Sequence, residues 1–297
     1  MIKLTFLGTS DAVPSAERNH TSILLTYDGE NILVDCGEGT QRQFRKLGLN
    51  PCKITRILLT HKHADHSIGI IGLMKTMELS GYNKTLYIYG PRGIKEFIGN
   101  IMRTFGEIEN YKVHVEEVSG KFFETDDFYL EAERMSHGVL CNAYNFVKKG
   151  QIKIDRAKLK KSGLPNGPLL KKLKEGKNIK HDGKKYFAKN LTYEEDGTKI
   201  SFVLDTEMNE RAIKFAKNSD LLVADSSFGS DLHDKAKLHK HLTAKQAAEI
   251  AKKSKSKKLI LTHISQRYEK KKEILLNEAK KVFKNSHLVK DLDVVEV

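Results

Sequence analysis

Four side chains that bind divalent metals fall within six residues, and they carry the strongest chemical signal in the chain. They are His61, His63, Asp65 and His66, and they follow the apolar run 57–59. Two histidines separated by one residue beyond a strand end can share one ion, and an aspartate and a histidine past the turn can face a second. Imidazole and carboxylate suit zinc, and paired zinc ions are a recurring device for hydrolysis. A histidine-rich surface turn is the alternative, but chance rarely produces this pattern.

A two-ion site needs more donors than one motif supplies, and three candidates follow expected strands. They are His137, Asp205 and His263. A carboxylate such as Asp205 can bridge two cations, whereas a lone histidine cannot. Each alone is more typical of a hydrogen-bonded surface residue, but with the first cluster they supply seven donors. His241 precedes an expected helix with Thr243 as N-cap and is free to act as a general acid, with a solvent-facing loop histidine as the alternative.

The elements that must position these side chains alternate between strands and helices. The pattern predicts strands at Ile2–Leu7, Thr21–Tyr27, Asn31–Asp35, Ile57–Thr60, Leu86–Tyr89, Val113–Val118, Phe128–Met135, Ala143–Val147, Lys199–Leu204, Leu221–Ala224 and Lys258–Thr262. It predicts helices at Thr40–Leu47, His66–Leu79, Gly93–Phe105, Asn209–Ala216, Thr243–Lys253 and Lys270–Phe283. Alternation in both halves of the chain predicts a layered α/β sandwich.

The segment 148–192 interrupts this alternation and holds most of the positive charge. Residues 148–190 contain fifteen Lys or Arg and three acidic residues, so they carry +12 of the net charge of +14. Such a patch suits a polyanion, because neutralising phosphates releases condensed counterions. A solvated lysine-rich surface is the alternative. The segment has too few apolar residues for a core of its own, so we expect an insertion that protrudes from the sandwich.

The composition limits the class of protein. A chain of 297 residues that is 39% hydrophobic can bury a sizeable core. No run approaches the roughly 18 apolar residues of a membrane span. Cys36, Cys52 and Cys141 are odd in number and lack zinc-finger spacing, which favours a reducing compartment over a disulfide framework. We therefore expect a cytoplasmic protein that does not bind membranes.

The histidine and aspartate pattern resembles the signature of the metallo-β-lactamase fold, and within that superfamily the chain resembles the ribonuclease Z family. The shared stretches span nearly the whole length and include 6–10, 34–41, 136–138, 241–244 and 261–265. The resemblance implies an αββα sandwich of residues 1–297 as a single domain, with 148–192 as an inserted basic arm. The stretch 164–169 resembles the Gly-Pro motif of the family's flexible arm, and Arg18 lies in a stretch that resembles its substrate loop.

The resemblance also implies an activity and its partners. The chain would be a zinc-dependent endoribonuclease that removes the 3′ trailer from precursor tRNA, leaving a 3′-hydroxyl on the tRNA and a 5′-phosphate on the trailer. It would form a homodimer in which the arm grips tRNA for the partner subunit's active site. The arm residues singled out for RNA binding are Gly167, Pro168, Lys160, Lys161, Lys171, Lys172 and Lys174.

The family's ligand roles carry over by position. One of two zinc ions per subunit would be held by His61, His63 and His137, and the other by Asp65, His66 and His263. Asp205 would bridge the ions, Asp65 would accept a proton from the nucleophile, and His241 would protonate the leaving group. The chain departs from the family in two places, because Leu204 replaces a glycine before Asp205 and Asp225 stands where a glutamate would orient His241.

Two other functions fit parts of the sequence. A small-substrate metallo-hydrolase of the same superfamily, either a phosphodiesterase or a thioesterase, would use the same donors, but it has no evident need for a cationic arm. A non-catalytic RNA-binding module would keep the arm and a structural metal site. Structural zinc sites are usually closed and hold one ion, whereas seven donors and a spare histidine favour an open two-ion site.

Overall fold

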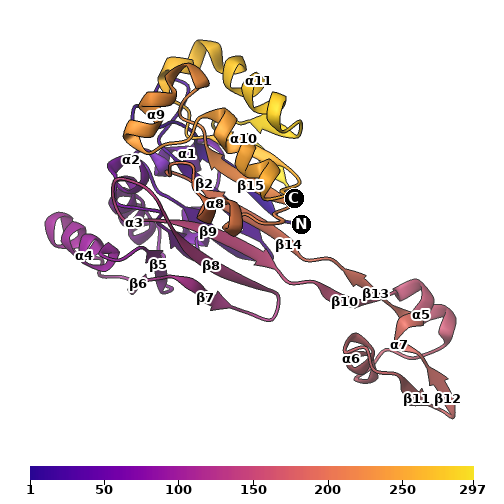
Figure 1. The fold of residues 1–297 in the computed structure, drawn as a ribbon. Helices are drawn as coiled ribbons and strands as arrows, with labels where there is room; N and C mark the ends of the chain where they lie inside the picture. Colours follow the sequence, from indigo (N-terminus) through magenta and orange to yellow (C-terminus); the bar gives the residue numbers. More distant parts are fainter. The chain divides into compact units, whose positions relative to one another are not determined.

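The computed structural model describes residues 1–297 and divides into two compact units. Unit 1 comprises Met1–Phe123, Leu130–Phe146 and Lys199–Val297, and unit 2 comprises Glu124–Tyr129 and Val147–Thr198. Figure 1 labels the helices and strands of both units. None of the helices has the length and apolar character needed to cross a membrane. The sequence predicted a single domain over residues 1–297 and an inserted arm at 148–192. Both remain predictions.

The first sheet of unit 1 has seven strands in the order β18-β1-β2-β3-β4-β5-β6. Its strands are β1 (Lys3–Gly8), β2 (Ser22–Tyr27), β3 (Glu30–Val34), β4 (Arg56–Leu58), β5 (Leu86–Gly90), β6 (Val113–Glu117) and β18 (Val294–Glu296). The strands β1, β2 and β3 pair antiparallel, and those from β3 to β6 pair parallel. The turn Asp28-Gly29 joins β2 to β3 with positive φ at both residues, as tight hairpins require.

Helices cover one face of this first sheet. They are α1 (Thr40–Lys46), α2 (Ala64–Ser67), α3 (Gly69–Leu79) and α4 (Ile94–Phe105), and a 3₁₀ turn, η1 (Pro51–Lys53), precedes β4. Phe44, Leu73 and Ile98 of these helices belong to one buried cluster with Leu33 and Ile57 of the strands. The sequence predicted one helix at His66–Leu79. The structure instead has two helices, α2 and α3, and the first begins at Ala64.

The second sheet of unit 1 also has seven strands, in the order β17-β16-β15-β14-β9-β8-β7. Its strands are β7 (Gly120–Glu124), β8 (Phe128–Met135), β9 (Cys141–Lys148), β14 (Thr198–Val203), β15 (Leu221–Asp225), β16 (Leu259–Thr262) and β17 (Ser286–Leu288). Its helical elements are α8 (Glu210–Phe215), η2 (Ser230–Leu232), α9 (His233–His239), α10 (Ala244–Lys253), η3 (Gln266–Lys271) and α11 (Lys272–Val282). A buried cluster joins Ala247, Ile250 and Leu275 of the helices to Leu222 and Leu261 of the strands.

The two sheets face each other between their helical layers. The rings of Tyr27 on β2 and Phe146 on β9 meet edge to face, with centroids 5.5 Å apart. The hydroxyl of Tyr144 on β9 donates to the carbonyl of Leu59 after β4, at 2.8 Å. Figure 1 shows α3 and α4 with the first sheet and α10 and α11 with the second. The expected αββα sandwich is confirmed.

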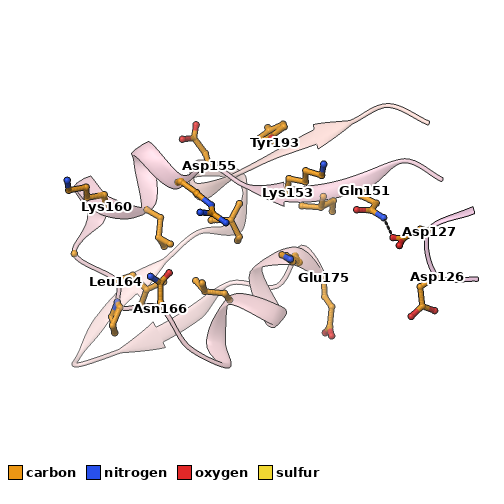
Figure 2. A pocket seen from close by; sticks show the side chains of 18 residues that line it. Asp126, Asp127, Gln151, Lys153, Asp155, Lys160, Leu164, Asn166, Glu175 and Tyr193 are labelled. Carbon is orange, nitrogen blue, oxygen red and sulfur yellow. Dashed lines mark hydrogen bonds between the residues drawn. The ribbon is translucent and has the colours of Figure 1, made fainter. Parts of the chain in front are cut away.

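Unit 2 contains a strand pair, a small hairpin and three short helices. They are β10 (Gln151–Ile154), α5 (Arg156–Ser162), α6 (Leu169–Lys174), β11 (Ile179–His181), β12 (Lys184–Tyr186), α7 (Ala188–Leu191) and β13 (Thr192–Glu195). The expectation that this segment lacks a core of its own is wrong. Seven of its residues form a buried apolar cluster, namely Leu159, Leu164, Leu173, Ile179, Tyr186, Ala188 and Leu191. An open hollow of about 1740 Å³ within the unit is lined by Lys153, Lys160 and Tyr193 among others (Figure 2).

Candidate metal centre

Parallel strands bring the dispersed donors to one edge of the second sheet. The register aligns Val203 on β14 with Ala224 on β15, and Asp225 with Thr262 on β16. The carboxyl ends of these strands therefore lie side by side. The residues at or just beyond these ends are Asp205, Asp225 and His263. Across the sandwich, the histidine motif follows β4 of the first sheet, and the backbone N–H of Asn142 at the start of β9 donates to the carbonyl of Thr60, at 2.9 Å.

The first donor set comprises His61, His63, His137 and Asp205, whose ligand atoms all lie within 4.8 Å of one another. His61 Nε2 is 2.9 Å from His63 Nδ1 and 3.5 Å from Asp205 Oδ2. His137 Nε2 is 3.3 Å from His63 Nδ1 and 3.8 Å from Asp205 Oδ2. Ligands of a tetrahedral zinc ion lie about 2.0–2.1 Å from the metal and so are separated by roughly 3.3 Å. The set therefore has the dimensions of one zinc-sized site.

The second donor set comprises Asp65, His66, Asp205 and His263. His66 Nε2 lies 3.2 Å from Asp65 Oδ2 and 3.3 Å from Asp205 Oδ1. His263 Nε2 lies 3.4 Å from Asp65 Oδ2 and 3.3 Å from Asp205 Oδ1. One oxygen of Asp205 thus faces the first set and the other faces the second. Asp205 therefore contributes an oxygen to each of the two donor sets.

The hydrogen bonds behind the imidazoles show that this pocket suits cations. His66 Nδ1 lies 2.6 Å from the Asp35 carboxylate, so Nδ1 carries a proton and Nε2 points toward the donor set. The Ser227 hydroxyl donates to a carboxylate and therefore accepts from His263 Nδ1, at 2.8 Å. The two Nε2 atoms then face each other at 3.0 Å, and Asp205 Oδ1 is buried beside them without a hydrogen-bond donor. A cation bound there would replace the protons on these nitrogens and give Asp205 Oδ1 a partner.

The charge states of the buried groups favour the same conclusion. Burial alone would raise the pKa of the Asp205 carboxyl, but the nearby imidazoles of His263 and His66 hold that pKa well below its usual range. Hydrogen bonds from the same histidines hold the pKa of Asp65 far below its usual value, against the effect of burial. Burial lowers the pKa of His61 well below its usual value, which keeps the ring neutral. Burial would lower the pKa of His66 and of His263, but Asp205 raises each well above its usual value, so a metal that binds these two rings would displace their Nε2 protons.

Asp35 is a buried carboxylate behind the motif that sequence reasoning missed. It accepts from the backbone N–H of Thr60 at 2.7 Å and from the Thr60 hydroxyl at 2.8 Å. Since that hydroxyl proton goes to Asp35, Thr60 Oγ accepts from His61 Nδ1, at 2.9 Å. Asp35 therefore orients two donors, His66 directly and His61 through Thr60. The available signal was the aspartate directly after the apolar strand, in the stretch Val-Asp-Cys-Gly.

Two residues at the site hold a backbone conformation that side chains rarely adopt. Asp35 has φ of 58° and His263 has φ of 59°. Each such residue costs on the order of 1 kcal/mol, and such strain gathers at functional sites. Close backbone approach also matters, because a Cβ at Gly69 would lie 1.9 Å from the carbonyl oxygen of Gly37. This contact holds the start of α3 against the loop after β3.

His241 and Asp225 form a hydrogen-bonded pair beside the donor sets. Asp225 Oδ2 lies 2.8 Å from His241 Nδ1, and its Oδ1 accepts from the backbone and hydroxyl of Ser227. The aspartate that replaces the family's glutamate therefore still reaches the ring. Burial alone would lower the pKa of His241, but the charge of Asp225 raises it above its usual value. The departure at Leu204 adds a side chain that is buried in the core.

The structure places the remaining predicted residues outside the donor sets. Arg18 is 2% exposed, donates to Thr9 Oγ at 2.6 Å and to the carbonyl of Val289 at 2.8 Å, and lies 3.3 Å from Glu269. Its role in a substrate loop stays a prediction. Gly167 and Pro168 precede α6 of unit 2. The five predicted arm lysines are all exposed, and they are Lys160, Lys161, Lys171, Lys172 and Lys174.

Known proteins are similar to this chain over its whole length. A ribonuclease Z of Methanothermobacter thermautotrophicus is 40% identical over 299 residues, which cover 100% of this chain and 97% of that protein. A ribonuclease Z of Streptococcus agalactiae is 37% identical and covers 100% of both chains. The family model of the anti-Pycsar protein Apyc1 matches residues 2–116. The full-length relatives therefore define the family more completely than this partial match.

Solved structures agree with this result. The short form of human tRNase Z has a TM-score of 0.73 and 26% identity, and the match covers 99% of each chain. The metallo-β-lactamase fold protein YhfI of Bacillus subtilis has a TM-score of 0.72 at 21% identity, covers 100% of this chain and 99% of its own, and shares the fold. Neither the small-substrate hydrolase nor the non-catalytic module is favoured by these relatives. The chain belongs to the ribonuclease Z family and is a ribonuclease, that is, a phosphodiester hydrolase.

Proposed function

We propose that this chain is a zinc-dependent endoribonuclease that cleaves the 3′ trailer from precursor tRNA. The products are a tRNA that ends in a 3′-hydroxyl and a trailer that begins with a 5′-phosphate. The observation that carries the proposal is the position of Asp205 between two sets of donors. It occurs in a chain with full-length relatives named ribonuclease Z.

The chemistry of the donor sets supports the proposal of two zinc ions. His61, His63 and His137 would hold one ion, Asp65, His66 and His263 the other, and Asp205 both. A pair of zinc ions supplies positive charge for the phosphate oxygens and makes a hydroxide nucleophile available near neutral pH. Imidazole and carboxylate ligands suit zinc, although the metal that occupies such a site also depends on availability.

Asp65 and His241 are the proposed proton-transfer groups. Asp65 belongs to the second donor set and is the proposed acceptor of the proton that the nucleophilic water loses. The Nδ1–H of His241 donates a hydrogen bond to Asp225, so Nε2 is the ring nitrogen that remains to face the RNA. Because the pKa of His241 is raised, the ring stays protonated at higher pH than an ordinary histidine and can donate to the departing 3′ oxygen.

Unit 2 is the proposed tRNA-binding arm. The five arm lysines are exposed and form no ion pair, so their charges are available to phosphates. Pro165 and Pro168 restrict the φ angles of the loop that joins α5 to α6, whereas Gly167 leaves it free at one position. We infer from the family resemblance that the enzyme is a cytoplasmic homodimer and that each arm serves the partner subunit's active site. The free cysteines fit a reducing compartment.

A cleavage assay on precursor tRNA tests the proposed function. The wild-type protein is expected to cut once at the 3′ side of the tRNA and to leave the predicted 3′-hydroxyl and 5′-phosphate ends. His63→Ala is expected to lose nearly all activity, because it removes a donor that contacts two others. His233→Ala is the matched control, since His233 on α9 is more than half exposed and belongs to neither donor set. Equal cleavage by wild type and His63→Ala would refute the proposal.

A further inference from the structure

A cationic hollow borders the first donor set of unit 1. Its volume is about 980 Å³, and His137 lines it. Four basic side chains line the same hollow, namely Lys62, Arg134, Arg211 and Lys240. The family resemblance assigned none of these four residues a role. The hollow therefore extends the candidate site beyond the metal donors.

Four separate parts of the chain bring these cations to the donors. Lys62 lies between the two histidines that begin the metal motif, and Arg134 lies on β8 shortly before His137. Arg211 lies on α8, which follows Asp205 along the chain. Lys240 has φ of 55°, and its carbonyl lies 3.1 Å from Nδ1 of His137. The backbone of Lys240 thus contacts His137, and the side chain of the same residue adds a positive charge to the hollow.

The positive charge of the hollow is only partly compensated by the residues that line it. None of the four basic side chains makes an ion pair with an acidic residue, although Lys148 and Lys153 elsewhere share Glu195. The acidic residue that lines the hollow is Glu210, so its lining carries a net charge of about +3. Uncompensated cations around a concave surface favour a ligand with several negative charges.

The other residues that line the hollow fit an unpaired nucleic acid strand. Met135, Val139 and Leu140 give it apolar surface, and Gly138 adds no side chain. Sites for single-stranded nucleic acid use cations that follow the phosphate backbone, and the hollow supplies these cations but no Phe, Tyr or Trp for base stacking.

We propose that this hollow binds backbone phosphates of the unpaired RNA that continues from the scissile bond. The inference rests on the proposed function and adds a binding site to it. The unpaired strand has two possible sources, the 3′ trailer and the unpaired 3′ end of the tRNA itself. Both offer the same chemistry, which is a flexible row of phosphodiesters next to the reacting one.

The test compares Arg134→Ala/Arg211→Ala with Lys214→Ala, an exposed lysine on the same helix as Arg211 that does not line the hollow. In single-turnover cleavage of precursor tRNA, the double variant should need about fivefold more enzyme for half-maximal rate, because two phosphate contacts are lost. Each lost contact should also reduce the salt dependence of log K by about 0.7 between about 50 and 200 mM salt. Lys214→Ala should match wild type in both measurements.

Two further measurements keep the outcomes distinct. Arg211→Lys should keep the salt dependence that Arg211→Ala loses, because charge and not shape is required. Precursors with short and long trailers separate the two sources, since a loss that grows with trailer length assigns the hollow to the trailer and a constant loss assigns it to the tRNA end.

Direct binding separates failure of the inference from failure of the proposed function. A fluorescent, unpaired oligoribonucleotide is titrated with each variant, and the double variant should bind it more weakly than Lys214→Ala does. If the wild type binds the oligonucleotide but does not cut precursor tRNA, the proposed function fails while the hollow remains an RNA site. If the double variant equals Lys214→Ala in binding, saturation and salt dependence, the inference is overturned.

Discussion

The donor cluster of unit 1 and the lysines of unit 2 solve different problems. In the cluster, His61, His66 and His263 each have a hydrogen-bond partner behind the ring, and the carboxylates are buried. In unit 2, Lys160 and Lys171 are exposed and have no ion pair. Holding ions requires atoms fixed to within a few tenths of an ångström, whereas attracting a polyanion requires only a density of charge. Single substitutions should therefore be severe in the cluster and mild in the arm.

The largest effect is expected for Asp205→Ala. The variant removes the oxygens that face both donor sets, so both ions should bind weakly and the cleavage rate should fall by on the order of 10³-fold or more. Metal content and cleavage of precursor tRNA measure the two losses. Asp234→Ala, at a fully exposed position, is the control. Full activity with Asp205→Ala would show that the cluster is not a bridged two-ion site.

Removing the arm should separate the two regions. Deletion of 151–195 joins Gly150 to Asp196. These two residues are already close together, because β10 and β13 pair antiparallel and Gln151 lies opposite Glu195. Cleavage of precursor tRNA should fall by about 100-fold or more, because most of the positive charge is lost. Hydrolysis of a small chromogenic phosphodiester should continue, since the donor sets lie in unit 1. Loss of both activities would show that the arm also supports the metal centre.

Asp225→Asn should change the pH dependence of cleavage. The carboxylate raises the pKa of His241, so the protonated acid persists to higher pH in the wild type. Removing that charge should lower the pKa, and the alkaline limb of the pH–rate profile should move to lower pH. The maximal rate should also fall by about 10- to 100-fold, as is usual when a group that orients a site residue is changed. An unmoved alkaline limb would show that another group is the acid.

The smallest effect is expected for a single arm lysine. Lys171→Ala should weaken tRNA binding by about twofold to fivefold and reduce the salt slope by about 0.9, which corresponds to one duplex phosphate contact. Binding of mature tRNA at several salt concentrations measures both quantities. A loss as large as that of a cluster variant would mean that the arm depends on fixed geometry after all.

The sequence predicted the donors because their identity and position are local. His61 and His66 share one motif, and His263 follows an apolar strand, so no tertiary information was needed to select them. Asp35 escaped prediction because its partner His66 is 31 residues away and the two meet only through the parallel pairing of β3 with β4.

The elements that the sequence did not predict are short or have few buried apolar residues. The strands β17 and β18 have three residues each, which is too short for a period to show. Helix α9 is mostly polar and buries only Ala236. The apolar cluster of unit 2 was missed because its members are scattered singly among lysines. Leu159, Leu173 and Ile179 come together only when α5, α6 and β11 fold.

Anomalous diffraction at the zinc edge, from crystals of the purified protein, tests the central claim most directly. The account predicts two peaks about 3.5–4 Å apart, one on each side of the Asp205 carboxylate. The first should lie among His61, His63 and His137, and the second among Asp65, His66 and His263. A single peak, or none between these donors, would contradict it.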